Sequence, residues 1–359
     1  MEANPNICII SWSANGLKIC ESLDEIKVQK NRSSFFTKYL KSCDTPDMFP
    51  TFDAIFNSPS PPLLVVIGFT DEAESYTYFH SEFLPSYMST RGYSFISRDK
   101  LQLEGVCRMS IYARQTIAQV VVVGDKINKG FFREPTVFPT SMNIESSGVL
   151  ASYVDVPGLG VLAFLLIKIE EDYENLSMSW DKEDPMIRKN HLLRADTIFN
   201  SIYRKFVLDV TNVDRVFIFG KLNYRMSMFD SDNLLDINAI ARNIEKGAIN
   251  VNEYYKNLDE LKKEMDAKNI YFMNEGIKNE GPKFLPTCDR KLGRRQLCKE
   301  ECFDLGLRKD RVPSWCLRIL YNEFDPDRQT ECVKYDRFEV GRTITKSLDA
   351  GVFGIYELK

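Results

Sequence analysis

The sequence reads Arg311-Val312-Pro313-Ser314-Trp315-Cys316-Leu317-Arg318-Ile319-Leu320-Tyr321 near its C-terminal end. The part from Trp315 to Tyr321 is mostly apolar, includes two aromatic residues and has the length of one strand, which predicts a strand. A tryptophan, a cysteine and an arginine at fixed positions around such a strand form a specific pattern. This makes the segment the most informative one in the chain.

Runs of similar length and character recur along the chain and predict further strands. They are Ile7–Trp12, Leu63–Phe69, Thr116–Val123, Gly160–Ile169, Arg215–Phe219 and Val352–Leu358. Between them, Glu183–Val207, Leu234–Lys246 and Asn252–Lys268 have the patterns of helices. Strands that alternate with helices predict an α/β protein. No internal repeat or low-complexity tract divides the chain, so we predict one domain over residues 1–359.

The composition is that of a soluble globular protein, with 44% hydrophobic and 27% charged residues. A formal net charge of -4 argues against a wholly basic nucleic-acid binder. The nine cysteines are irregularly spaced, match no common zinc pattern, and accompany an N-terminus without a signal peptide. The longest apolar run, Leu159–Ile167, is about half of a membrane span. We therefore expect a cytoplasmic protein with no transmembrane segment, no metal and no cofactor.

Three segments in the second half, taken together, match one known family in order and spacing. Gly220-Lys221-Leu222-Asn223-Tyr224-Arg225 follows a hydrophobic strand where the family reads Gly-Asp-Leu-Asn-Tyr-Arg. Leu258-Asp259-Glu260-Leu261 and then Phe284-Leu285-Pro286-Thr287 resemble its Asp-Gln-Leu helix and Phe-x-Pro-Thr-Tyr-Lys segment. Arg311–Tyr321 resembles Arg-x-Pro-Ala-Trp-Cys-Asp-Arg-Ile-Leu-Tyr. The chain thus resembles the catalytic domain of inositol polyphosphate 5-phosphatases, within the endonuclease/exonuclease/phosphatase superfamily.

Weaker matches extend the resemblance toward the N-terminus. Ser11–Asn15 looks like the opening Thr-Trp-Asn-x-Asn, Ile67–Asp71 looks like the metal motif Ile-Gly-Phe-Gln-Glu, and Asn128-Lys129-Gly130 keeps a turn of the family. The resemblance implies a four-layer α/β sandwich, in which helices flank two mixed β-sheets and the active site lies at one edge.

The family's reaction, as the resemblance implies, is Mg²⁺-assisted hydrolysis of a phosphate ester. Carboxylates hold the metal, an aspartate activates water, and a histidine stabilises the charge that grows on the phosphoryl group. The positions that depart from this pattern are Ser13 for an asparagine, Asp71 for the metal glutamate (or Glu72 if the register slips), Lys168 for a histidine (to within about one residue), Lys221 for the water-activating aspartate, Leu317 for an aspartate, and Leu348 and Asp349 for the closing aspartate and histidine.

A count that needs no alignment points the same way. The chain holds two histidines, His80 and His191, and both lie outside every motif, where we expect packed or surface side chains. We therefore predict a pseudoenzyme without catalytic residues. In the former site, Lys221 is expected to repel Mg²⁺ and to form an ion pair with Asp71 or Asp349.

Several motif residues are retained, and these are Asn128, Asn223, Tyr224, Arg225, Trp315 and Arg318. We expect the aromatic ones to support the core, whereas Arg225 and Arg318 could either do the same or contact phosphate. The family's substrate-holding Pro-Thr-Tyr-Lys reads Pro286-Thr287-Cys288-Asp289 here, which weakens the case for inositol phosphate binding.

Three classes of function remain open. The first is a binding, structural or regulatory subunit of a larger protein or ribonucleoprotein assembly. Its RNA contact would use the basic Arg290–Arg311 region, although interleaved acidic residues also fit a solvated helical face. The second is a non-catalytic reader of phosphoinositides or inositol phosphates, which would act at a membrane through Arg225 and Arg318. The third is a residual Mg²⁺-dependent 5-phosphatase.

Overall fold

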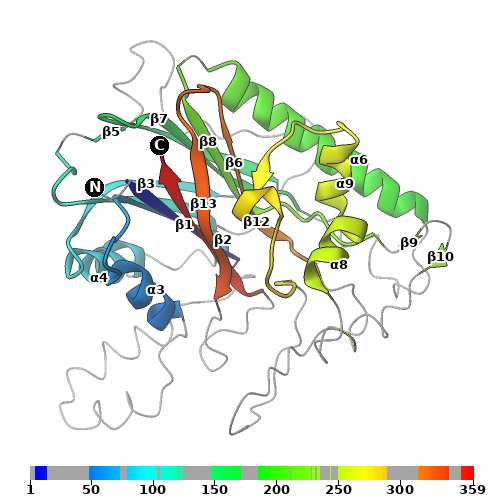
Figure 1. Cartoon of the computed structure of the whole chain (residues 1–359), viewed down its shortest axis with the longest axis horizontal. Coiled ribbons are helices and arrows are strands. Elements are labelled where there is room, and N and C mark those ends of the chain that lie inside the picture. Colours follow the sequence, from blue (N-terminus) through cyan, green and yellow to red (C-terminus); the bar gives the residue numbers. More distant parts are fainter. Residues whose placement is uncertain are drawn as a thin grey trace, which may run out of the picture.

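The computed structural model describes residues 5–13, 48–72, 79–102, 106–119, 121–123, 147–170, 185–210, 212–227, 229–230, 233–234, 243, 250–288, 314–338 and 349–359. In this part of the chain two mixed β-sheets are packed face to face, with helices on both outer sides (Figure 1). The predicted four-layer α/β sandwich is confirmed. No described helix combines the length and the apolar character that crossing a membrane would require.

The first sheet has the strand order β13-β14-β1-β2-β4-β3. Its strands are β1 (Asn6–Ser13), β2 (Leu64–Glu72), β3 (Tyr93–Gln102), β4 (Val106–Arg114), β13 (Thr330–Phe338) and β14 (Gly351–Leu358). β1 and β2 are parallel, and β14 runs antiparallel to β1. The C-terminal ends of β1 and β2 therefore lie beside the beginning of β14.

The second sheet has the order β11-β12-β8-β7-β6-β5. Its strands are β5 (Val122–Val123), β6 (Gly148–Val156), β7 (Gly160–Lys168), β8 (Arg215–Lys221), β11 (Asn274–Glu275) and β12 (Leu317–Glu323), and a small hairpin, β9 (Phe229–Asp230) with β10 (Asn233–Leu234), stands apart. β7 and β8 are parallel and in register, so Lys168 lies opposite Lys221 at their C-terminal ends. Parallel pairs in both sheets thus end with polar side chains.

The core between the sheets is built from alternate residues of these strands, such as Val66, Leu166, Phe219 and Leu317. Gly68 lies where the sheets approach closely, because a Cβ there would come within 2.5 Å of the ring of Phe219. A larger residue at position 68 would push the two sheets apart.

Helices bury the outer faces of both sheets. α3 (Met48–Phe56), the π-helix η1 (Phe79–Phe83) and α4 (Leu84–Ser89) belong to the side of the first sheet, and α3 and α4 pack on β1 and β2. The second sheet is covered by α6 (Pro185–Tyr203), the π-helix η4 (Arg204–Leu208) and α9 (Glu260–Asp266), beside which lie α8 (Val251–Leu258) and the 3₁₀-helix η5 (Ile277–Asn279) (Figure 1).

One predicted strand was wrong in part. Among the described residues of Thr116–Val123, Val122–Val123 forms a strand, β5, residues 116–119 are turns, and residue 121 is in no regular element. Ile117 and Ala118 still pack against the core between the sheets. Their apolar character therefore reflects burial in the core and not pairing in a β-sheet. The strands β3, β4, β6 and β13 were not predicted. In β4, buried polar residues such as Arg108 and Ser110 interrupt the apolar run.

The helix expected over Asn252–Lys268 is two helices, α8 and α9, separated at Asp259. This residue has an extended backbone (φ -68°, ψ 123°), ends α8 and caps α9, where its carboxylate accepts a hydrogen bond from the amide of Lys262 (3.0 Å). Most of the other expected helix, Leu234–Lys246, lies outside the described residues, and Leu234 itself belongs to β10.

Candidate functional site

The candidate site lies where β1, β2, β7 and β8 end and β14 begins. Asp71 is at its centre. One carboxylate oxygen accepts a hydrogen bond from Ser13 Oγ (2.9 Å) and faces Lys221 Nζ (3.3 Å), and the other oxygen forms an ion pair with Lys168 Nζ (2.6 Å). Both oxygens are therefore occupied by protein donors.

A β-bulge decides that Asp71, and not Glu72, enters this site. The register between β2 and β4 shifts after Phe69, and Asp71 has a left-handed backbone with φ of 58°. Glu72 points the other way, to Arg108 Nε (2.9 Å) and His80 Nε2 (2.7 Å). The alternative in which Glu72 takes the place of the metal glutamate is thus wrong.

Two lysines and three carboxylates make up the charged cluster, which we call the Asp71 pocket; its members are Asp71, Lys168, Glu170, Lys221 and Asp349. Besides the contacts to Asp71, Lys168 Nζ lies 2.7 Å from Glu170 Oε2, and Lys221 Nζ lies 3.9 Å from Asp349 Oδ2. Both lysine side chains are at least nine-tenths buried. The expected ion pairs of Lys221 with Asp71 and with Asp349 are both present.

The pKa values in the pocket follow from this arrangement. Burial by itself would raise the pKa of Asp71, but the charges of Lys221 and Lys168 outweigh it and hold the pKa below its ordinary value. Burial would likewise lower the pKa of Lys168, but Asp71 and Glu170 raise it instead. Burial raises the pKa of Glu170 against the opposing charge of Lys168. Lys168 is therefore held in its charged form.

The residues present do not suit Mg²⁺. This ion needs several hard oxygen ligands in a near-octahedral shell, whereas here the central carboxylate is bound by two ammonium groups. No group of three or more histidine, cysteine, aspartate or glutamate side chains in the described part of the chain is placed to hold a metal ion. Leu317, opposite Lys221 in the β8–β12 ladder, is fully buried in the core between the sheets and offers no ligand.

Sequence reasoning found most of the pocket. The structure brings together Ser13, Asp71, Lys168, Lys221 and Asp349, as the aligned motifs suggested. Leu348, Asn128 and the basic Arg290–Arg311 region lie outside the described residues. Glu170 was missed, although a carboxylate two residues after a buried lysine at a strand end was an available signal.

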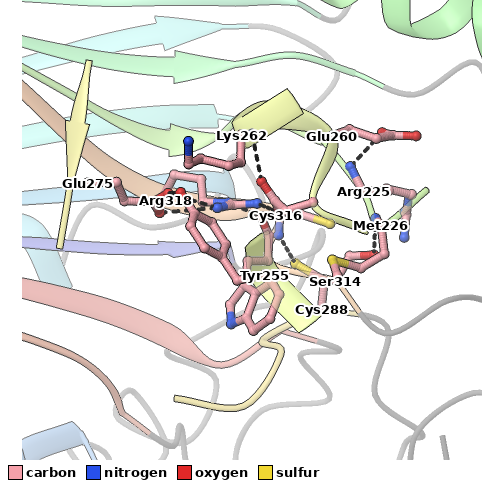
Figure 2. A network of polar contacts seen from close by, with 12 residues as sticks. Arg225, Met226, Tyr255, Glu260, Lys262, Glu275, Cys288, Ser314, Cys316 and Arg318 are labelled. Carbon is pink, nitrogen blue, oxygen red and sulfur yellow. Dashed lines mark hydrogen bonds and ion pairs between the residues drawn. The ribbon is translucent and has the colours of Figure 1, made fainter. Parts of the chain in front are cut away.

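The retained motif residue Arg318 belongs to a second buried network, on the other face of β12 (Figure 2). Its guanidinium binds the carboxylates of Asp259 and Glu275, with Nη1 3.0 Å and 3.2 Å from the two oxygens of Glu275. The hydroxyl groups of Tyr255 (2.9 Å) and Tyr335 (3.0 Å) donate to the same glutamate. We call these five residues the Arg318 network. Arg318, Asp259 and Glu275 have no exposed side-chain surface.

The remaining retained residues also have structural contacts. The side-chain amide of Asn223 donates to the carbonyl oxygen of Ile169, and Tyr224 donates to Asp196 (2.8 Å). Arg225 is 2% exposed, and its backbone exchanges hydrogen bonds with Glu260. Trp315 is fully buried. Arg225 and Arg318 are both buried, so in this structure neither side chain is presented to a phosphate at the surface, and phosphate binding through them stays a prediction.

Comparisons with known proteins agree with this architecture. The sequence profile of endonuclease/exonuclease/phosphatase family 2 matches residues 68–344. The inositol polyphosphate 5-phosphatase domain of SPsynaptojanin, solved with inositol (1,4)-bisphosphate and a calcium ion, is 19% identical, with a TM-score of 0.61 over 99% of this chain and 84% of that one. Cimex nitrophorin, solved as a ferrous NO complex, is 13% identical, with a TM-score of 0.55 over 100% of both chains. No curated protein sequence matches the chain.

At these identities the solved structures bear on the fold alone. The expected fold of the inositol polyphosphate 5-phosphatase domain is confirmed. The same fold is compatible with more than one function, since one similar structure holds an inositol bisphosphate and another is a ferrous NO complex. The chemistry of this chain must therefore be argued from its own residues.

Proposed function

The chain belongs to the endonuclease/exonuclease/phosphatase family, and we propose that it is a member that catalyses no hydrolysis and serves as a binding subunit of a larger assembly. The observation that carries the proposal is the position of two lysine ammonium groups on the central carboxylate, Lys168 and Lys221 on Asp71. In a metal-dependent phosphatase the metal cation binds beside such a carboxylate. Here the two ammonium groups occupy that position and neutralise the negative charge.

The two groups at the centre of the pocket, Asp71 and Lys168, do not suit acid–base chemistry. A general base must accept a proton near the working pH. The pKa of Asp71 is held low by its two lysines, so it is a weak base, and the pKa of Lys168 is raised, so it keeps its proton. No step of phosphate hydrolysis can therefore be assigned to these side chains.

In the described part of the chain both sheets and the core between them are formed, which supports a role that depends on shape. The core between the sheets is continuous, and the Arg318 network keeps every carboxylate beside a cation or a hydroxyl group. Lys168 and Lys221, at the positions of the family's histidine and water-activating aspartate, neutralise Asp71, and Leu317 is buried in place of an aspartate. Such a fold needs no metal cation to balance the charge of Asp71. A folded protein that catalyses no reaction is suited to recognising a partner through its surface.

The test has two parts on the purified full chain. Phosphate release from inositol phosphates with Mg²⁺ is expected to equal that of the protein-free reaction, and calorimetric titration with Mg²⁺ is expected to give no binding heat. Mg²⁺-dependent release that Asp71→Ala abolishes and the surface variant Lys283→Ala retains would overturn the proposal. Lys283 suits this comparison because its side chain is 53% exposed.

The binding role is tested by isolating the tagged chain from its own cells, with and without RNase. Partners present in constant proportion are expected, and loss after RNase would assign the assembly to ribonucleoprotein. Recovery of the chain alone would count against a subunit role.

A further inference from the structure

A groove of about 580 Å³ lies far from the Asp71 pocket, between the last turns of α6 and the segment that follows α9. Asn200 and Arg204 line it on one side, and Lys268, Tyr271 and Phe272 line it on the other. We call it the Phe272 groove. It lies near the N-terminal end of β8, whereas Lys221 ends the same strand, about 20 Å away at about 3.3 Å per residue.

The contacts around the groove fix its shape. The side chain of Asn200 donates to the carbonyl oxygen of Asn269 (2.8 Å) and accepts from the amide of Tyr271 (3.2 Å). The ring of Tyr271 is stacked on Tyr203, with centroids 4.5 Å apart and planes 16° from parallel. Lys268 turns the chain out of α9 with a left-handed backbone (φ 59°). The loop is thus held against α6, and the groove exists before any ligand arrives.

Apolar side chains are unusually exposed here. Phe272 is 49% and Tyr271 is 38% exposed. β11 pairs with β12 so that Asn274 lies opposite Tyr321, and Phe324, directly after the end of β12, is 41% exposed. Leu208, 49% exposed, lies in η4 at the same end of the sheet. An exposed cluster of large apolar side chains of this kind is typical of an interaction surface.

The charge of the groove indicates which kind of partner it binds. Arg204 and Lys268 line it, and no carboxylate is among the described residues that do so. A carboxylate from a partner would form a charge-assisted hydrogen bond with Arg204, while the apolar floor would take an aliphatic or aromatic side chain. Two cations are too few for a phosphate backbone, especially on a chain with a net charge of -4.

We propose that the Phe272 groove binds a short acidic peptide segment of a partner protein, anchored by one apolar side chain. This inference deepens the proposed function and rests on it, because it identifies the surface through which a non-catalytic subunit would join its assembly. Arginine and aromatic residues are the types that dominate binding energy at such interfaces.

The experiment selects random twelve-residue peptides displayed on phage against the full chain. Peptides that combine an apolar residue with at least two acidic ones are expected to be enriched. A synthetic copy of the enriched sequence is then titrated by fluorescence polarisation. Binding is expected to weaken at least tenfold in Phe272→Ala and in Arg204→Glu, and to weaken with added salt.

Leu193→Ala is the matched control, since Leu193 is a 65% exposed apolar residue on the same helix, seven positions before Asn200. It is expected to bind the peptide like the unmodified chain. Circular dichroism establishes that the two groove variants fold.

The inference is overturned by enrichment of no peptide or of basic peptides, by binding of the peptide to Phe272→Ala and Arg204→Glu as tightly as to the unmodified chain, or by a groove-dependent dimer of this chain in light scattering. Single-stranded RNA bound through the same residues would also overturn it. The phosphate-release assay separates this failure from that of the proposed function. The groove variants leave the Asp71 pocket unchanged. Phosphate release, if found, would therefore contradict the proposed function and not the peptide-binding groove.

Discussion

The Asp71 pocket and the Arg318 network are both buried ionic clusters, and β12 lies beside both, because Leu317 pairs with Lys221 of the pocket and Arg318 belongs to the network. Leu317 points into the core between the sheets, while Arg318 points to the opposite face, toward Asp259 and Glu275. The network keeps the family's motif residue and a full set of partners. The pocket has exchanged its motif residues for lysines and apolar side chains. A residue that departs from the family's motif, Leu317, thus directly precedes one that matches it, Arg318, in the same strand.

The two clusters also differ in how far each charged group depends on a single partner. In the pocket three charges have two partners each, because Asp71 contacts both lysines, Lys168 contacts Asp71 and Glu170, and Lys221 contacts Asp71 and Asp349. In the network one guanidinium serves two carboxylates that have no exposed surface. Its loss would leave the buried carboxyl groups of Asp259 and Glu275 without the guanidinium that binds both of them.

The largest effect is expected from Arg318→Met. Removing one partner of a buried ion pair typically costs about 3–5 kcal/mol of unfolding free energy, so the variant should be severely destabilised or fail to fold. Urea unfolding followed by circular dichroism measures this. Arg328→Ala is the control, because this arginine is 34% exposed beside Asp214 and Asp325 and should cost less than about 1 kcal/mol. Equal stability of the two variants would show that the buried network needs its arginine no more than the surface needs Arg328.

Much of this comparison was predictable from sequence, and the rest depends on long-range geometry. Motif spacing placed Lys221 beside Asp71 and Asp349, since strands that end at one edge bring their last residues together. The choice between Asp71 and Glu72 depended on a bulge whose positive φ is not evident in the sequence. The partners of Arg318 lie 59 and 43 residues away, at a helix cap and on a two-residue strand, so no local pattern indicated them.

An intermediate effect is expected from pH, with opposite signs in the two clusters. The folded pKa of Asp71 lies below its ordinary 3.8, so its stabilising contribution is present above that value and is lost as the pH falls below it. Burial raises the pKa of Asp259 to about 7, with Glu275 adding to this and Arg318 opposing it. The folded state thus favours protonated Asp259, and this residue's contribution to stability falls as the pH rises from 3.8 to about 7.

Urea unfolding between about pH 3 and pH 8 separates the two contributions. Asp71→Asn should flatten the dependence on pH below 3.8, and Asp259→Asn should flatten it between 3.8 and about 7. Asp327→Asn, at an exposed position in the turn after β12, should run parallel to the unmodified chain. Curves for all three variants that run parallel to it throughout would show that neither aspartate has the shifted pKa inferred from its surroundings.

The smallest effect, and the sharpest test of the pocket, is expected from Lys221→Asp. The substitution removes one cation from Asp71 and adds a carboxylate beside it, so a divalent cation gains oxygen ligands while Lys168 still opposes it. An ion at about ten times its Kd stabilises by about 1.4 kcal/mol, a rise in Tm of about 1–3 °C for a chain of this size.

Thermal unfolding with Mg²⁺ or Ca²⁺ is expected to show this rise in Lys221→Asp, but neither in the unmodified chain nor in Lys221→Met, which removes the charge without adding a ligand. An equal rise in the unmodified chain would mean that the lysines do not exclude the ion, and the argument against metal chemistry would fail. A rise confined to Lys221→Asp would mean that one side chain separates this pocket from a cation site. No single substitution is expected to convert the Arg318 network into a cation site, because the carboxylates of Asp259 and Glu275 are fully buried.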